Sequence, residues 1–121
     1  MAGRTFEINL DWIPPASLRG NSNAHWRTRH KNRKAMRNSG YFHFIANDGE
    51  ALKKARITYH FIHNRDIDLD NIAYGMKAFV DGCVDAGLCK DDSPQYVTYG
   101  EHTFTKKPKT SRTRIQIEEI A

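Results

Sequence analysis

Three aspartates at alternate positions are the most distinctive chemical feature of the sequence. Asp66, Asp68 and Asp70 lie in the segment Asp-Ile-Asp-Leu-Asp-Asn, and alternate side chains of an extended segment project to the same side. Ionised carboxylates at roughly 5 Å repel by about 3 kcal/mol per pair at an effective dielectric constant near 20, so such a cluster requires a cation or protonation. Oxygen ligands without Cys or His favour Mg2+, with Mn2+ as the alternative, over Zn2+. A calcium loop is disfavoured, because Asn71 replaces its glycine and Lys77 its last glutamate.

A second acidic pair, Asp91 and Asp92, follows the next predicted helix. We expect the chain to return there to the end of the sheet that carries Asp68 and Asp70, so that Asp92 completes the site. Metal-dependent cleavage of a phosphodiester needs such an arrangement, since the cation lowers the pKa of an attacking water and neutralises charge on the scissile phosphate. Lys77 is the only lysine on the intervening helix and is our candidate for a further positive charge.

The same acids also have a purely structural interpretation. Asp70 can cap the start of a helix, Asp81 and Asp85 can be exposed helix residues, and the second acidic pair can shape a turn. We prefer the structural interpretation for Asp81 and Asp85, and the metal-binding interpretation for Asp68, Asp70 and Asp92.

Positive charge is segregated into two segments on either side of the acidic centre. The net charge is +5, and no acid lies between Asp11 and Asp48 or between Glu101 and Glu118. Basic segments of this kind either form solvated faces or bind a polyanion, where they contact phosphates rather than read bases. The candidate DNA-contacting residues are those of the first segment: Arg19, Arg27, Arg29, Lys31, Arg33, Lys34 and Arg37.

Hydrophobic periodicity predicts the elements that position these residues. Alternating apolar residues predict a strand over 6–12, ended by Pro14 and Pro15, and a second strand over 55–63 with Ile57, Tyr59 and Phe61 on one face. A polar loop over 16–27 precedes a helix over 31–47. The apolar face predicted for this helix comprises Ala35, Met36, Ser39, Phe42, His43 and Ala46, with a left-handed cap at Gly49.

The second half of the chain contains one more predicted helix and two strands. Asp70 is expected to cap the helix and Gly87 to end it. Its apolar residues recur at helical spacing, and they are Ile72, Met76, Phe79, Val80 and Cys83. Strands over 96–105 and 112–117 are predicted to pair as an antiparallel hairpin across Lys-Lys-Pro-Lys. The order β-α-β-α-β-β indicates one α+β domain over 1–121, built on a small mixed sheet with two main helices.

Composition excludes several other classes of protein. No run of about 18 apolar residues is present, which indicates a cytoplasmic protein without a membrane partner. Cys83 and Cys89 lack CxxC spacing, so we expect free, mostly buried thiols and no zinc ribbon. The glycines form no P-loop and no nucleophile elbow, which leaves nucleotide hydrolysis and acyl transfer without support.

The acidic centre resembles the core of the RusA family of Holliday junction resolvases. The matching features are Asp-Leu-Asp-Asn at 68–71, a helix that closes in Asp-Ala-Gly at 85–87, and Lys-Asp-Asp at 90–92 followed by Gln-Tyr-Val at 95–97. A first strand ending in Pro-Pro, a Ser/Asn-rich segment over 17–26 and a basic stretch over 27–37 are also similar to the family. The similarity spans nearly the whole chain and is strongest over 68–97.

This resemblance implies a magnesium-dependent homodimer that cuts four-way DNA junctions by paired nicks in a bacterial or phage-infected cell. Carried over by position, Asp68, Asp70 and Asp92 are the metal-binding catalytic acids. The family's helix lysine comes sooner after the Asp-Asn pair, so that Lys77 aligns with it only if about three residues are inserted; without the insertion, Tyr74 takes that position.

The sequence therefore predicts a structure-selective endodeoxyribonuclease that acts on branched DNA in recombination and repair. Two alternatives stay open. In one, the protein is a non-catalytic DNA-binding accessory of replication or recombination, in which the aspartates only cap and space elements. In the other, the nuclease acts on flaps, forks or RNA instead of four-way junctions.

Overall fold

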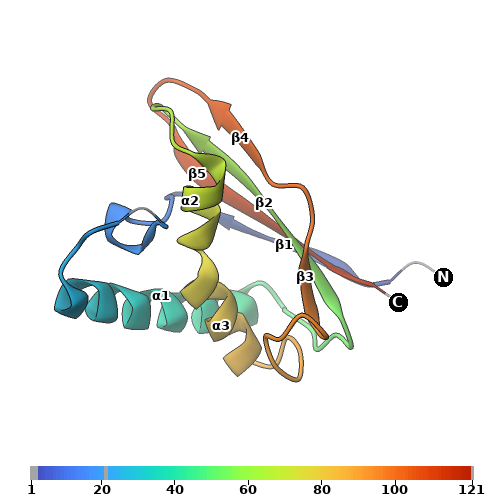
Figure 1. The fold of residues 1–121 in the computed structure, drawn as a ribbon. Coiled ribbons are helices and arrows are strands. Elements are labelled where there is room, and N and C mark those ends of the chain that lie inside the picture. The colour runs from blue at the N-terminus through green and yellow to red at the C-terminus, as the bar shows by residue number, and fades with distance from the viewer. Residues whose placement is uncertain (1–2, 21, 121) are drawn as a thin grey trace.

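Five strands form one mixed sheet, and the helices lie against one of its faces (Figure 1). The computed structural model describes residues 3–20 and 22–120. The strands are β1 (Thr5–Leu10), β2 (Ala55–His63), β3 (Val97–Tyr99), β4 (Thr103–Lys106) and β5 (Ser111–Glu119). The helices are α1 (Trp26–Ala46), α2 (Leu69–Tyr74) and α3 (Lys77–Asp85), with a 3-10 turn at Ala16–Leu18. This is the α+β class that the sequence predicts.

Strand β2 is the centre of the sheet. Its inward residues Ala55, Ile57, Tyr59 and Phe61 are all buried, as the alternating pattern predicts. One edge of β2 pairs antiparallel with β5, which in turn pairs with β1, and the other edge pairs in parallel first with β3 and then with β4. The predicted hairpin of 96–105 with 112–117 is therefore wrong, because β2 lies between these two segments and takes both as partners.

The predicted strand over 96–105 is divided at His102. Gly100 donates its backbone N–H to the Ile57 carbonyl, but at the next step the backbone N–H of Tyr59 donates to Nδ1 of His102 at 2.9 Å instead of to a backbone carbonyl. A side chain thus fills the gap in the ladder between β3 and β4.

Helix α1 begins at Trp26, five residues before the predicted start, after His25 caps it by accepting from the Arg27 N–H. Its buried residues are Met36, Gly40 and Phe44, whereas the predicted face members Ala35, Phe42 and Ala46 are exposed. The left-handed residue after the helix is Asp48, with φ 56°, rather than Gly49.

Two glycines explain why the buried face of α1 differs from the predicted one. A Cβ on Gly40 would collide with the Phe79 carbonyl, and a Cβ on Gly82 would collide with the Arg37 carbonyl. Helices α1 and α3 thus cross backbone to backbone at this pair. A face chosen by side-chain hydrophobicity overlooks such a contact, because glycine has no side chain to bury.

The predicted helix after Asp70 forms as two helices, α2 and α3, that meet at Gly75 and Met76. A Cβ on Gly75 would approach the ring of Pro14 to 2.6 Å, so the break lets the chain pass the end of β1 closely. All five predicted apolar positions of this segment are buried. Gly87 has φ 110° and follows the end of α3, as predicted.

Two further expectations concern the membrane and the thiols. Within residues 3–20 and 22–120, no helix combines the length and the apolar character needed to cross a bilayer. Cys83 and Cys89 are free and buried, as the sequence predicts.

Candidate functional site

The aspartates before α2 do not form the predicted extended row. Asp68 is the N-cap of α2, and its Oδ1 accepts from the backbone N–H groups of Asp70 at 2.9 Å and Asn71 at 3.2 Å. Asp70 lies in the first turn of α2, so it is not the cap that the sequence suggested. Asp66 points elsewhere and pairs with Lys106 at 3.3 Å, with 82% of its side chain exposed. The prediction of three converging carboxylates is wrong because the chain turns helical at Leu69.

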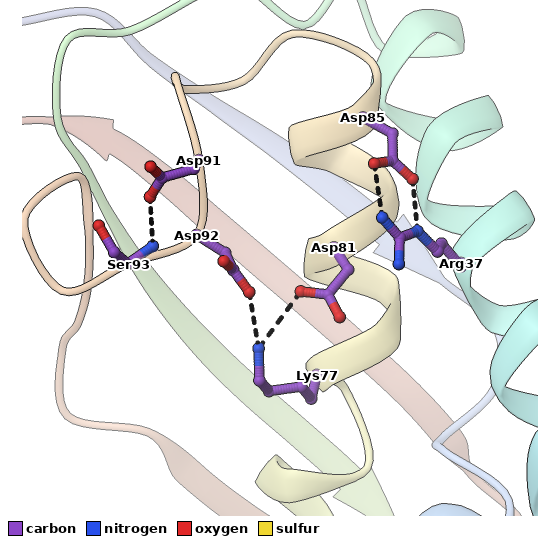
Figure 2. Close-up of polar contacts among 7 residues, drawn as sticks. All are labelled: Arg37, Lys77, Asp81, Asp85, Asp91, Asp92 and Ser93. Carbon is purple, nitrogen blue, oxygen red and sulfur yellow. Dashed lines mark hydrogen bonds and ion pairs between the residues drawn. The ribbon is translucent and has the colours of Figure 1, made fainter.

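Lys77 is the centre of a three-residue ionic cluster, which Figure 2 shows. Its Nζ lies 2.9 Å from Oδ2 of Asp92 and 3.3 Å from Oδ1 of Asp81. Lys77 and Asp81 are one turn apart on α3, whereas Asp92 comes from the loop that follows α3. The cluster therefore joins two segments separated by 15 positions.

Asp92 approaches from the end of the sheet opposite to the one that we predicted. Strand β3 starts beside Ala55, the first residue of β2, whereas Asp68 and Asp70 follow the last residue of β2. A parallel crossover must return the chain to the start of the preceding strand, so Asp92 cannot enter from the same end as Asp68. Helices α2 and α3 span the interval, and Lys77 on α3 contacts Asp92.

The three groups of the cluster shift one another's pKa values. The hydrogen bond from Lys77 lowers the pKa of Asp92. Burial raises the pKa of Asp81, and the neighbouring Asp92 carboxylate adds to this effect. Burial opposes the charged form of Lys77, but hydrogen bonds and charges from Asp92 and Asp81 outweigh it and raise the pKa. The charged ammonium thus stabilises two acids that would otherwise repel each other.

A pocket of about 260 Å³ brings Asp70 to the same place as Lys77. Both residues line it, together with Tyr74, so the helix positions that the sequence left as alternatives for the family's lysine both face one pocket. The pocket is closed on the side of the sheet by Tyr59 and His102. The structure therefore places Asp70 and Lys77 on one pocket, and Asp92 in contact with Lys77 but not on the pocket wall. Asp68 caps the helix that carries Asp70.

The oxygen donors at this place suit a hard divalent cation, although they are not arranged as a complete ligand set. Within the described ranges 3–20 and 22–120, no three His, Cys, Asp or Glu side chains are grouped closely enough to hold a metal ion. Instead, Asp81 and Asp92 share the Lys77 ammonium, a positive charge held by two carboxylates. Carboxylates without Cys or His are the donors that Mg2+ takes, usually with several waters retained.

Sequence reasoning missed Asp81, which we assigned to an exposed helix surface. Its side chain is only 23% exposed and contacts Lys77. The available signal was the spacing, because a lysine and an acid four residues apart share one helix face.

The basic face of α1 borders this cluster. Arg33 lines one small pocket with Lys77 and Asp81, and a second one of about 240 Å³ with Lys34, Arg37 and Asp81. Arg37 is held by Asp85 in a two-point contact, with Nε at 2.5 Å and NH2 at 2.8 Å from the carboxylate oxygens (Figure 2). Arg33 and Lys34 thus present cationic groups next to the acidic cluster, while Arg37 faces Asp85.

The remaining candidate DNA contacts lie nearer the start of α1 or before it. Arg19 is half-buried and donates from Nε to the Pro14 carbonyl, and burial lowers its pKa. Arg27 lies over the Trp26 ring at 5.3 Å, and Nε of Arg29 is buried without a hydrogen-bond partner among the described residues. Lys31 is exposed. Trp26 is 66% exposed, so its ring does not pack in the core.

Asp91 and Asp85 have the roles that the structural interpretation of the acidic residues assigns to them. Asp91 accepts from the Ser93 N–H at 2.7 Å and so shapes the turn before β3, whereas Asp85 holds Arg37 (Figure 2). Neither contacts Lys77.

No protein-family model matches the chain, and no curated protein matches it significantly.

Proposed function

We propose that this protein is a magnesium-dependent, structure-selective endodeoxyribonuclease that cuts branched DNA. The observation that carries the proposal is the position of Lys77, which contacts Asp92 and Asp81 and shares a pocket with Asp70. The resemblance of residues 68–97 to the RusA family supports the same function, and four-way junctions are the substrate that this resemblance implies.

The acidic residues and Lys77 have different roles in the proposed cleavage of the phosphodiester. Asp81 and Asp92 share the Lys77 ammonium, and Asp70 lines the pocket beside it, so these three carboxylates would have to close around a bound Mg2+ to hold it. Asp68 fixes the start of α2, which carries Asp70. The ion, when bound, activates a water and neutralises charge on the phosphate. The Lys77 ammonium, raised in pKa and hence charged at neutral pH, is positioned to stabilise negative charge that develops on a phosphate oxygen.

The basic residues of α1 orient the DNA. Arg33 and Lys34 border the cluster at Asp81 and supply phosphate contacts on the same side of the molecule. Contacts of this type give affinity and register rather than sequence reading, which suits an enzyme that selects a branched shape. Arg27 and Lys31, both exposed towards the start of α1, extend this cationic surface.

Paired nicks across a junction need two active sites related by a two-fold axis, so the proposed protein acts as a homodimer. Light scattering of the full chain at the concentration used for cleavage measures this directly. A dimer mass is the expected result.

A non-catalytic DNA-binding accessory is the second candidate. The ion pairs of Lys77 favour it, because the lysine alone already neutralises Asp92 and part of Asp81. In this alternative the acidic cluster serves only to join α3 to the following loop.

A cleavage assay on a synthetic four-way junction separates the two candidates. Mg2+ or Mn2+ is added to one arm and EDTA to the other, with excess linear duplex as competitor. The proposed nuclease gives symmetric nicks only in the presence of the metal. Shifted bands without nicks in both arms support the accessory protein, and equal cutting of linear duplex contradicts structure selectivity.

A further inference from the structure

The pocket beside Lys77 has mostly aromatic walls. Tyr59, Tyr74, Tyr99 and His102 line it, and Ala73 adds a methyl group. Its volume of about 260 Å³ lies just below the roughly 300–1,000 Å³ typical of pockets that enclose drug-sized ligands. A single flat ring system is the size of group that it can admit.

Two of these rings are accessible to a ligand. Tyr74 is 53% and Tyr99 47% exposed. They come from different elements, Tyr74 from the end of α2 and Tyr99 from the end of β3, and face the same pocket. Two exposed rings that converge on one pocket offer stacking surfaces from separate segments.

The floor of the pocket is fixed. Tyr59 is 2% exposed, and the His102 ring stacks on it with centroids 4.5 Å apart and planes at 28°. Tyr99 meets His102 edge to face at 5.8 Å and 71°. The rings hold one another in place, so a stacked ligand would meet preorganised partners.

His102 also supplies a defined hydrogen-bond donor. Its Nδ1 accepts the backbone N–H of Tyr59 at 2.9 Å, so this nitrogen carries no hydrogen. The hydrogen of the neutral ring is therefore on Nε2, for which no protein partner is found within residues 3–20 and 22–120. Since His102 lines the pocket, this N–H is the candidate donor to a ligand with an acceptor on its edge.

We propose that this pocket binds one nucleobase of the DNA strand, next to the phosphate that is cut. A nucleobase combines stackable faces with acceptors on its edge, which matches the tyrosine rings and the His102 N–H. Lys77 at the rim is then placed for the phosphate of the same nucleotide. This inference rests on the proposed function, since it places the base at the site where cleavage is proposed.

Abasic nucleotides test the base-binding role independently of cleavage. They are placed one at a time at each position near the crossover of a four-way junction, and affinity is measured in EDTA. Removal of the base should weaken binding at only one position of each bound strand. The expected loss is about 5- to 150-fold, the range measured when an aromatic residue that stacks on a base is replaced by alanine. The protein is tested as wild type, Tyr74→Ala and Tyr74→Phe, after each is shown to melt at the wild-type temperature.

The proposal predicts that the effects of Tyr74→Ala and of the abasic nucleotide on affinity are not independent. Tyr74→Ala should weaken binding of the intact junction by the same factor and should lose its sensitivity to the abasic position, whereas Tyr74→Phe should behave as wild type. The proposal would be overturned if Tyr74→Ala bound the intact junction with wild-type affinity. It would also be overturned if the losses of affinity from Tyr74→Ala and from the abasic position multiplied, because the two effects would then be independent. A changed dimer mass for Tyr74→Ala with an unchanged abasic profile would show a protein partner in the pocket, which also overturns it.

The same measurements distinguish failure of the nuclease proposal from failure of the base-binding proposal. In that case wild-type protein makes no metal-dependent nicks, yet the coupled loss of affinity between Tyr74→Ala and one abasic position remains. If nicks are made and neither Tyr74→Ala nor any abasic position alters binding, the nuclease proposal stands and the base-binding pocket is rejected.

Discussion

The Nζ of Lys77 lies 2.9 Å from a carboxylate oxygen of Asp92, and this contact links α3 to the loop that leads into β3. Asp81 makes a second contact from one turn further along α3, at 3.3 Å. The lysine is therefore held from two sides and kept charged, at the rim of the pocket that contains Asp70. The proposed role of Lys77 in cleavage depends on this arrangement.

Replacing Lys77 with methionine should reduce junction cleavage by about 100- to 1,000-fold, the loss typical when one donor to a developing charge is removed. Methionine keeps the aliphatic stem, so the fold should be retained. Single-turnover cleavage in saturating Mg2+ measures the effect. Lys90→Met, at an exposed lysine just before Asp91, is the matched control and should cut at the wild-type rate; a Lys77→Met protein that also does so would remove the lysine from the mechanism.

Removing the carboxylate of Asp85 should strengthen DNA binding. Asp85 holds Arg37 in a two-point contact, and the two side chains are 39% and 53% exposed, so the pair contributes only about 0–1 kcal/mol to stability. In Asp85→Ala the freed guanidinium joins the basic face of α1. The plot of log affinity against log salt should become steeper by about 0.9, the contribution of one further phosphate contact. An unchanged slope would show that Arg37 does not reach the DNA.

A methyl group at Gly82 should destabilise the fold strongly. The Cβ would collide with the Arg37 carbonyl where α1 and α3 cross, and overpacking of this kind typically costs about 1–3 kcal/mol. Chemical denaturation of Gly82→Ala measures the loss of unfolding free energy. Ala35→Ser, at an exposed position of α1, should change stability by no more than about 0.5 kcal/mol. Equal stability of the two variants would refute the close crossing.

Protonation of His102 should oppose folding. Burial lowers its pKa below the usual 6.5, so the unfolded chain binds this proton more readily than the folded one. The free energy of unfolding should therefore fall as the pH decreases from about 7 to 5. His102→Phe keeps the ring but cannot take up the proton, so its stability should depend less on pH over this range, whatever its absolute value. A His102→Phe curve parallel to that of wild type would show that another group is responsible.

The sequence predicts those elements whose signal is local. Ile57, Tyr59 and Phe61 identify the buried face of β2 by simple alternation, and Ile72 to Cys83 identify the buried side of α2 and α3 by helical spacing. The hairpin prediction failed because pairing depends on which edges of β2 are free, and this is a long-range property. The face of α1 was misassigned because its closest contact is made by Gly40, which a hydrophobicity pattern cannot register.

The candidate site was predictable in part for the same reason. Asp70, Lys77 and Asp92 could be selected by residue type, but the path of Asp92 depends on the parallel crossover from β2 to β3. Asp81 lay within reach of sequence reasoning, since its four-residue spacing from Lys77 is a helix-face relationship. The aromatic pocket could not be predicted from the sequence, because Tyr74 and Tyr99 come to line one pocket only in the folded chain.

Metal-dependent cleavage by two aspartate variants tests the central claim most directly. Asp70→Asn and Asp92→Asn are compared with Asp66→Asn, an exposed residue of the same acidic segment, in single-turnover cutting of a four-way junction with Mg2+. The first two should lose about 10- to 100-fold in rate while binding the junction as well as wild type or better, and Asp66→Asn should cut normally. Retained cleavage by Asp70→Asn or Asp92→Asn would contradict the assignment of these acids to a nuclease site.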